Sequence, residues 1–130
     1  MLGEQIAELK GKITGQRVLD SEGAMETSIS ARGSVRGTHV SENLTFVARP
    51  TSAGVLQGEG QGVMAGDSEM ATYTGKAMGR FTSSGIKFGG AVFYRTSSTG
   101  KLSFLNNIVG VFESEIDSEG NFTERIWEWT

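Results

Sequence analysis

Most of the chain consists of short runs in which apolar and polar residues alternate, separated by turn-forming residues. Alternation with a period of two is typical of a strand that has one buried face. We expect strand-like runs at residues 12–20, 25–40, 43–50, 55–65, 69–81, 86–96, 101–116 and 121–130. The second run is long, so we expect it to bend at Gly33 or Gly37. Residues 4–10 fit either one short helical turn or a frayed start of the first strand.

The connections between these runs are short, so consecutive strands should be antiparallel neighbours. Eight strands in this order leave two unpaired edges unless the first strand also pairs with the last. The sequence therefore predicts an all-β fold, with one domain over residues 1–130 that is a single antiparallel eight-stranded up-and-down (meander) β-barrel.

Glycines are concentrated in residues 58–80, and those at 58, 60 and 62 alternate, so they share one face of a strand. A phosphate-binding loop would need a helix after the glycines and a Lys-Ser/Thr pair at its end, whereas a turn follows here. We interpret these glycines as positions that allow the coiling and close backbone approach of a small barrel.

Glu59 lies between two of these glycines, on the same strand face as Gln57 and Gln61. If this face is in solvent, Glu59 is an ordinary exposed acid. If it faces the lumen, Glu59 needs a partner and acquires a raised pKa, which suits a general acid or base. Glu59 is thus the candidate catalytic residue, and Gln57 and Gln61 are candidate ligand contacts.

Side chains on later strands are further candidates for contact with a ligand in the lumen. They are Tyr73, Tyr94, Arg95, Asn107 and Trp127. Arg95 equally fits a surface position with its stem packed on apolar neighbours. Asn106 and Asn107 interrupt an apolar run, so one of them should point inward unless a bulge or tight bend accounts for the pair. Trp127 and Trp129 share a face that suits a plug, a lumen wall or a homodimer interface.

Composition limits the possible chemistry. The absence of cysteine excludes disulfides and thiolate metal sites, and the single histidine, His39, offers no metal-ligand spacing. We therefore expect no metal and no cofactor. A net charge of −3 without a basic stripe argues against nucleic acid as a partner. No apolar run approaches a membrane span and no secretory signal is recognisable, so we expect a cytoplasmic protein.

The repeated layout of glycines and turns in GEGQGV, YTGKAMG and IKFGGAVFY resembles that of small calycin-type barrels. In size the chain is similar to the allene-oxide-cyclase-like group. The G-x-W signature of lipocalins is absent, and no catalytic motif of the cyclases can be placed on these residues. The resemblance implies an eight-stranded barrel that binds a hydrophobic or amphipathic small molecule or catalyses a cyclisation in its lumen.

Three functions remain open at the level of sequence. The first is binding of a small hydrophobic or amphipathic molecule in the lumen. The second is an isomerase or cyclase that uses Glu59 as a lumen carboxylate. The third is a solid barrel that acts as an oligomerisation or interaction module, for example by forming a homodimer through the strand face that carries Trp127 and Trp129. A filled or a hollow lumen separates the third function from the first two.

Overall fold

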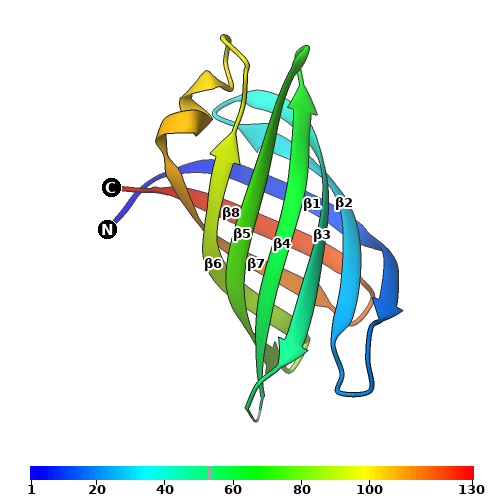
Figure 1. Cartoon of the computed structure of the whole chain (residues 1–130). Helices are drawn as coiled ribbons and strands as arrows, with labels where there is room; N and C mark the ends of the chain where they lie inside the picture. The colour runs from blue at the N-terminus through cyan, green and yellow to red at the C-terminus, as the bar shows by residue number, and fades with distance from the viewer. Residues whose placement is uncertain (53) are drawn as a thin grey trace.

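The protein is a closed β-barrel in the computed structural model, which describes residues 1–52 and 54–130. The strands are β1 (Leu2–Val18), β2 (Met25–Val35), β3 (Thr38–Pro50), β4 (Val55–Gly66), β5 (Glu69–Thr82), β6 (Gly85–Arg95), β7 (Val109–Asp117) and β8 (Asn121–Trp129). Each strand pairs with the next in antiparallel orientation, and β1 also pairs with β8, so no strand edge is left open (Figure 1). The predicted all-β, eight-stranded up-and-down barrel is confirmed.

The N-terminal residues belong to the barrel wall and form no helical turn. β1 begins at Leu2, so residues 4–10 are part of a strand that pairs with β2 on one side and β8 on the other. Strand structure is favoured here because a helical turn would leave the end of β8 without a hydrogen-bonding partner. The two chain ends therefore lie side by side, with Met1 and Thr130 joined by backbone hydrogen bonds.

The long second run is divided by a tight turn, which replaces the expected bend. Arg36 and Gly37 both have positive φ angles, 44° and 81°, between the paired residues Val35 and Thr38. Two-residue turns of this hand match the twist of the flanking strands. Residues 25–40 therefore supply all of β2 and the start of β3.

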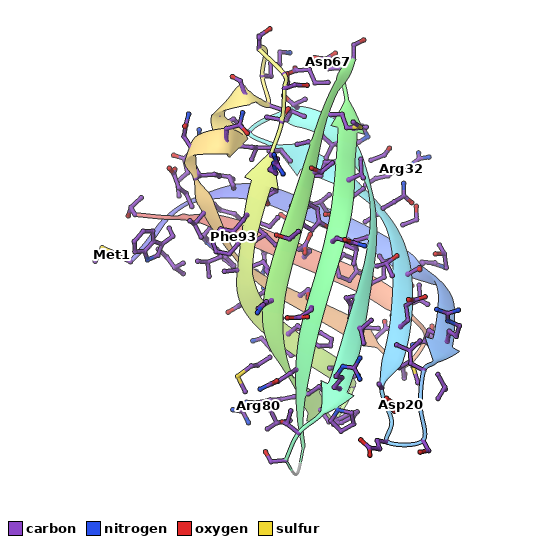
Figure 2. All side chains as sticks on the ribbon, in the orientation of Figure 1. Met1, Asp20, Arg32, Asp67, Arg80 and Phe93 are labelled. Carbon is purple, nitrogen blue, oxygen red and sulfur yellow. The ribbon has the colours of Figure 1, made fainter. Side chains whose placement is uncertain are left out.

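The seventh run contains a short 3-10 helix, η1 (Ser103–Asn107), before β7 begins. Leu102 and Leu105 are buried in the core, and the guanidinium of Arg36 lies 4.2 Å from the centre of the Phe104 ring. This segment therefore covers one end of the barrel, the end at which Figure 1 shows the orange helical turn and Figure 2 labels Asp67. Among the described residues no helix is long and apolar enough to cross a membrane.

The interior differs between the two ends of the barrel. Towards η1 the inward side chains are almost fully buried; they include Leu9, Val35, Val40, Met64, Leu102 and Leu105. Towards the opposite end, which carries Asp20 in Figure 2, Leu56 and Ile116 are buried, but several other inward side chains are only partly buried; they include Ile13, Leu44, Phe46, Ala48 and Ile86. The lumen is therefore tightly packed at the η1 end and looser at the other.

Candidate functional site

The glycine face of β4 points into the barrel, where it makes room for large aromatic rings. A Cβ atom on Gly62 would lie within 2.7 Å of three atoms of the Tyr73 side chain. On β5, a Cβ atom on Gly79 would lie 2.5 Å from Cε1 of Phe88. Because these glycines have no side chain, the rings of Tyr73 and Phe88 lie flat across the inner wall and fill part of the lumen.

Two carboxyl groups meet in the middle of the barrel. Glu42 on β3 and Glu124 on β8 are 0% and 6% exposed, and their carboxyl groups lie close enough together for each to shift the pKa of the other. The hydroxyl of Tyr73 donates to Oε2 of Glu42 at 2.6 Å. Among the described residues, Oε1 of each glutamate has no hydrogen-bond partner. Two buried carboxylates without a counter-ion repel each other, so we expect this acid pair to retain one proton between its two members, here called the shared proton.

The two members of the acid pair differ in their surroundings. Burial raises the pKa of Glu124 well above its ordinary value, and the nearby charge of Glu42 raises it further. Burial also raises the pKa of Glu42, but the hydrogen bonds from Tyr73 and Glu124 act in the opposite direction. We therefore place the shared proton on Glu124 and the negative charge on Glu42.

Two tyrosines complete this layer of the core. The rings of Tyr73 and Tyr94 meet edge to face, with their centres 5.7 Å apart. Burial is the largest cause that raises the pKa of both hydroxyls, and the charges of Glu42 and Glu124 add to it. Both tyrosines therefore remain protonated at neutral pH and act only as neutral hydrogen-bonding groups.

No cation within the barrel balances the charge of the acid pair. All twelve lysine and arginine residues and His39 are exposed, and every one of them belongs to the described part of the chain. A buried charge without a counter-ion is unfavourable. The acid pair therefore has no cationic side chain to balance a charge inside the described barrel.

A cavity of about 60 Å³ lies beside the acid pair, towards the looser end of the barrel. Its walls are mainly apolar and include Leu44, Phe46, Phe88, Phe112 and Phe122. Of the side chains that point inward at the cavity, only Tyr73, Ser114 and Glu124 are polar, and Ser114 pairs with Glu124 across β7 and β8. Glu42 does not line the cavity. The site thus has an apolar body and one polar pole.

The volume of the cavity sets the size of any occupant. A water molecule needs roughly 10–15 Å³ measured in this way, so the cavity holds roughly four to six non-hydrogen atoms. Pockets for drug-sized ligands are several times larger. The lumen is therefore mostly filled by side chains, and only a very small molecule fits without repacking.

The structure places the predicted site residues in two groups. Tyr73 and Tyr94 lie in the lumen. Gln57, Glu59, Gln61 and Arg95 are exposed on the outer face, Asn107 is exposed in η1, and Trp127 is partly buried on the outer face of β8. Both Asn106 and Asn107 are exposed, so neither points inward. The amide of Asn106 instead forms two hydrogen bonds with the backbone of Thr96, at 2.9 and 2.7 Å.

The lumen position considered for Glu59 is wrong. Its side chain is 71% exposed and forms an ion pair with Lys76, its cross-strand neighbour, at 3.2 Å. The physical reason is the glycine face of β4, which has to point inward to accommodate Tyr73. The carboxylates of the lumen are Glu42 and Glu124.

A sequence signal for these two residues exists. Glu42 alternates with Val40, Leu44 and Phe46 on one face of β3, and Glu124 lies between Phe122 and Ile126 on one face of β8. An acid in an otherwise apolar period-two stripe is a buried acid if that stripe faces the core. The sequence does not show that Glu42 and Glu124 meet, because β3 and β8 are not neighbours in the sheet and their side chains come together only inside the closed barrel.

Comparison of the chain with protein-family models, with curated proteins and with solved structures finds no match. The barrel architecture implied by the resemblance to calycin-type proteins is present, whereas membership of that group or of the allene-oxide-cyclase-like group stays a prediction. The function has to be argued from the site itself.

Proposed function

We propose that the barrel binds a small amphipathic molecule in the cavity beside the acid pair. The observation that carries the proposal is the combination of an apolar, aromatic wall with a single polar pole formed by Glu124 and Ser114. Binding sites for small molecules have this composition, in which apolar groups supply the contact area and a few polar groups fix the orientation.

The size of the cavity limits the affinity of such a ligand. The best very small ligands gain about 1.5 kcal/mol per non-hydrogen atom, so five atoms supply at most about 7.5 kcal/mol. This corresponds to a dissociation constant of a few micromolar at best. We therefore expect dissociation constants between micromolar and millimolar.

The proposal is tested by filling the cavity. A Cβ atom on Gly58 would be 3.8 Å from Phe88, an ordinary contact, so a side chain can start here, and the methyl groups of Gly58→Val fill part of the cavity. Its matched control is Gly89→Val, because Gly89 faces outward and its nearest neighbour would be 3.9 Å away. Amide chemical shifts are measured while fragments of four to six non-hydrogen atoms are added.

We expect fragments to shift the lumen amides of the wild type and of Gly89→Val, and not those of Gly58→Val. Failure of every fragment to bind the wild type, or equal binding to both valine variants, contradicts a ligand site in this cavity.

A second candidate, the interaction module, is supported by the outer face of the barrel. Ala91, Val111 and Trp127 are cross-strand neighbours on β6, β7 and β8, and the Phe93 side chain beside them is 54% exposed (Figure 2). If two copies pair through this face, Phe93→Glu should convert a dimer into a monomer in sedimentation velocity. A monomeric wild type at about 100 μM contradicts this candidate, since stable interfaces give much tighter association.

The isomerase or cyclase alternative also stays a prediction, but with a different catalytic residue. Its acid would have to be Glu124 because Glu59 lies outside the lumen. The cavity holds only part of a long-chain substrate, so this reaction would need the wall to open. Binding of a small molecule needs no such rearrangement, and for that reason we place it first.

A further inference from the structure

We infer that the ligand of the lumen is a small organic cation with N–H groups, an alkylammonium ion whose head binds Glu124 and Ser114 beside the acid pair. The inference rests on the proposed function, because it names the class of molecule that occupies the same cavity. It is carried by the geometry of three features, which are the unpartnered carboxyl oxygens, the absence of an internal cation and the aromatic walls.

The hydrogen-bonding capacity of the cavity favours a donor. Glu124 is more than nine-tenths buried, lines the cavity, and has one oxygen, Oε1, that has no hydrogen-bond partner in the described chain. Once Glu124 has given up its proton, its carboxylate only accepts hydrogen bonds, and the hydroxyl of Ser114 on the same wall can accept one as well. An ammonium head carries two or three N–H donors and no acceptor, so it complements this pole.

The electric charge of the cavity points to the same class. When the acid pair holds a single proton it carries a negative charge, and all lysines, arginines and His39 lie on the outer surface. A ligand with a carboxylate or phosphate would be repelled by this charge, and a neutral ligand would leave it unbalanced. A monovalent cation neutralises it. A metal ion is less suitable, because no group of three or more His, Asp or Glu side chains comes together within the described residues.

Movement of the shared proton from Glu124 to Glu42 places the negative charge on the carboxylate that contacts the bound ammonium ion. In the empty barrel we place the proton on Glu124 and the charge on Glu42. When an ammonium head arrives at Glu124, the O–H bond on Glu124 breaks and an O–H bond on Oε1 of Glu42 forms. The negative charge then lies on the carboxylate that lines the cavity, while Tyr73 continues to donate to Oε2 of Glu42.

The remaining walls suit the alkyl part and the charge of such an ion. The aromatic side chains of Tyr73, Phe88, Phe112 and Phe122 line the cavity, and aromatic faces attract cations as well as providing apolar contact. With roughly four to six non-hydrogen atoms available, the ligand is an amine of about three to five carbons.

Isobutylammonium and isobutanol provide a matched pair of probes, because they have the same shape and differ in charge. Binding of each is measured by amide chemical shifts at pH 7 and constant ionic strength, to the wild type, to Gly58→Val and to the double variant Glu42→Gln/Glu124→Gln. We expect the wild type to bind isobutylammonium at least tenfold more tightly than isobutanol. The double variant should lose this preference, and Gly58→Val should bind neither probe.

The possible failures are distinguishable. If the wild type binds isobutanol as tightly as isobutylammonium, the lumen site stands and the inference of a cation is wrong. If Gly58→Val or the double variant binds isobutylammonium as tightly as the wild type, the ion binds elsewhere on the acidic surface and the inference is also wrong. If neither probe binds the wild type, both the inference and the proposed function fail for molecules of this size.

A pH titration of the wild type keeps the inference testable if the double variant does not fold. The groups that face the cavity or the acid pair are Glu42, Tyr73, Tyr94 and Glu124, and both tyrosines stay neutral. Acid adds a second proton to the pair and removes its charge. The preference for isobutylammonium over isobutanol should therefore fall as the pH is lowered, and a preference that is constant between pH 5 and pH 8 overturns the inference.

Discussion

Replacement of Gly62 by alanine should disturb the acid pair without touching either glutamate. The new Cβ atom would lie within 2.7 Å of three Tyr73 atoms, whereas ordinary contact begins at 3.4 Å. The two nearest of these atoms would be 2.4 Å away, so the tyrosine has to retreat by about 1.0 Å to restore ordinary contact. Its hydroxyl cannot follow that movement and keep the 2.6 Å hydrogen bond to Glu42.

The size of the effect follows from two losses. Overpacking of a core costs about 1–3 kcal/mol. Loss of a hydrogen bond to a charged buried group costs about 1.5–3 kcal/mol. Alanine recovers about 0.5–1 kcal/mol because it is less flexible than glycine in the unfolded chain. We expect Gly62→Ala to lower the free energy of unfolding by about 2–5 kcal/mol, a large share of the roughly 5–15 kcal/mol typical of a domain.

Urea denaturation monitored by circular dichroism measures this change, and Gly89→Ala is the control. Gly89 faces outward, and a Cβ atom there would approach nothing closer than the Phe112 carbonyl oxygen at 3.9 Å. Gly89→Ala should leave the free energy of unfolding within about 0.5 kcal/mol of the wild type or raise it slightly. Equal effects of the two alanines would refute the assignment of the inner face of β4 and the role of Gly62 in positioning Tyr73.

Further predictions concern charge and the loop at the end of the barrel. The pKa values of Glu42 and Glu124 are raised in the folded state, so above pH 4.5 the native state binds more protons than the unfolded chain. The free energy of unfolding therefore falls as the pH rises towards the folded pKa values. The slope is up to about 1.4 kcal/mol per pH unit for each retained proton. Urea midpoints between pH 5 and pH 8 should decline for the wild type and stay nearly constant for Glu42→Gln/Glu124→Gln, and a constant wild type contradicts the shared proton. Glu59→Gln should change the free energy of unfolding by less than about 0.5 kcal/mol, because its ion pair with Lys76 is exposed; a loss above 2 kcal/mol would show that Glu59 is not a surface residue. Asn106→Ala removes two hydrogen bonds to Thr96, so we expect it to lower the free energy of unfolding by about 1–2 kcal/mol in the same denaturation assay. Asn107→Ala is the control, because among the described residues the Asn107 side chain forms no hydrogen bond, and an equal loss in both variants would contradict the role of Asn106.

The fold was predictable because its determinants are local. Alternation and short turns define consecutive antiparallel strands, and closure follows from the need to pair the outer edges. The boundaries were less accurate where a turn lacks the usual residues, as at Arg36–Gly37, where an arginine adopts positive φ. The run at 101–116 reads as one strand, yet it begins with a 3-10 helix at Ser103–Asn107, in which Leu105 is buried, and β7 starts only at Val109.

The site was harder to predict because alternation groups residues by face without indicating which face is inside. On β4 the usual indicator fails, since Gly58, Gly60 and Gly62 carry no apolar side chain although they point inward. Glu59 was therefore weighed as a lumen residue. Tyr73 and Tyr94 lie in the lumen, on strand faces that also carry other small or apolar residues, whereas their contact with a ligand stays a prediction.

The acid pair is a feature that stability alone does not explain. Replacement of a buried ionic group by neutral residues of similar volume is often neutral or stabilising. At pH 8 we therefore expect Glu42→Gln/Glu124→Gln to be at least as stable as the wild type while it loses the preference for an ammonium ion. The acid pair lies beside a cavity whose wall contains several glycines. The barrel therefore loses packing contacts and stability at this one location. Such local departures from good packing are expected at binding sites, and this one coincides with the only polar pole of the cavity.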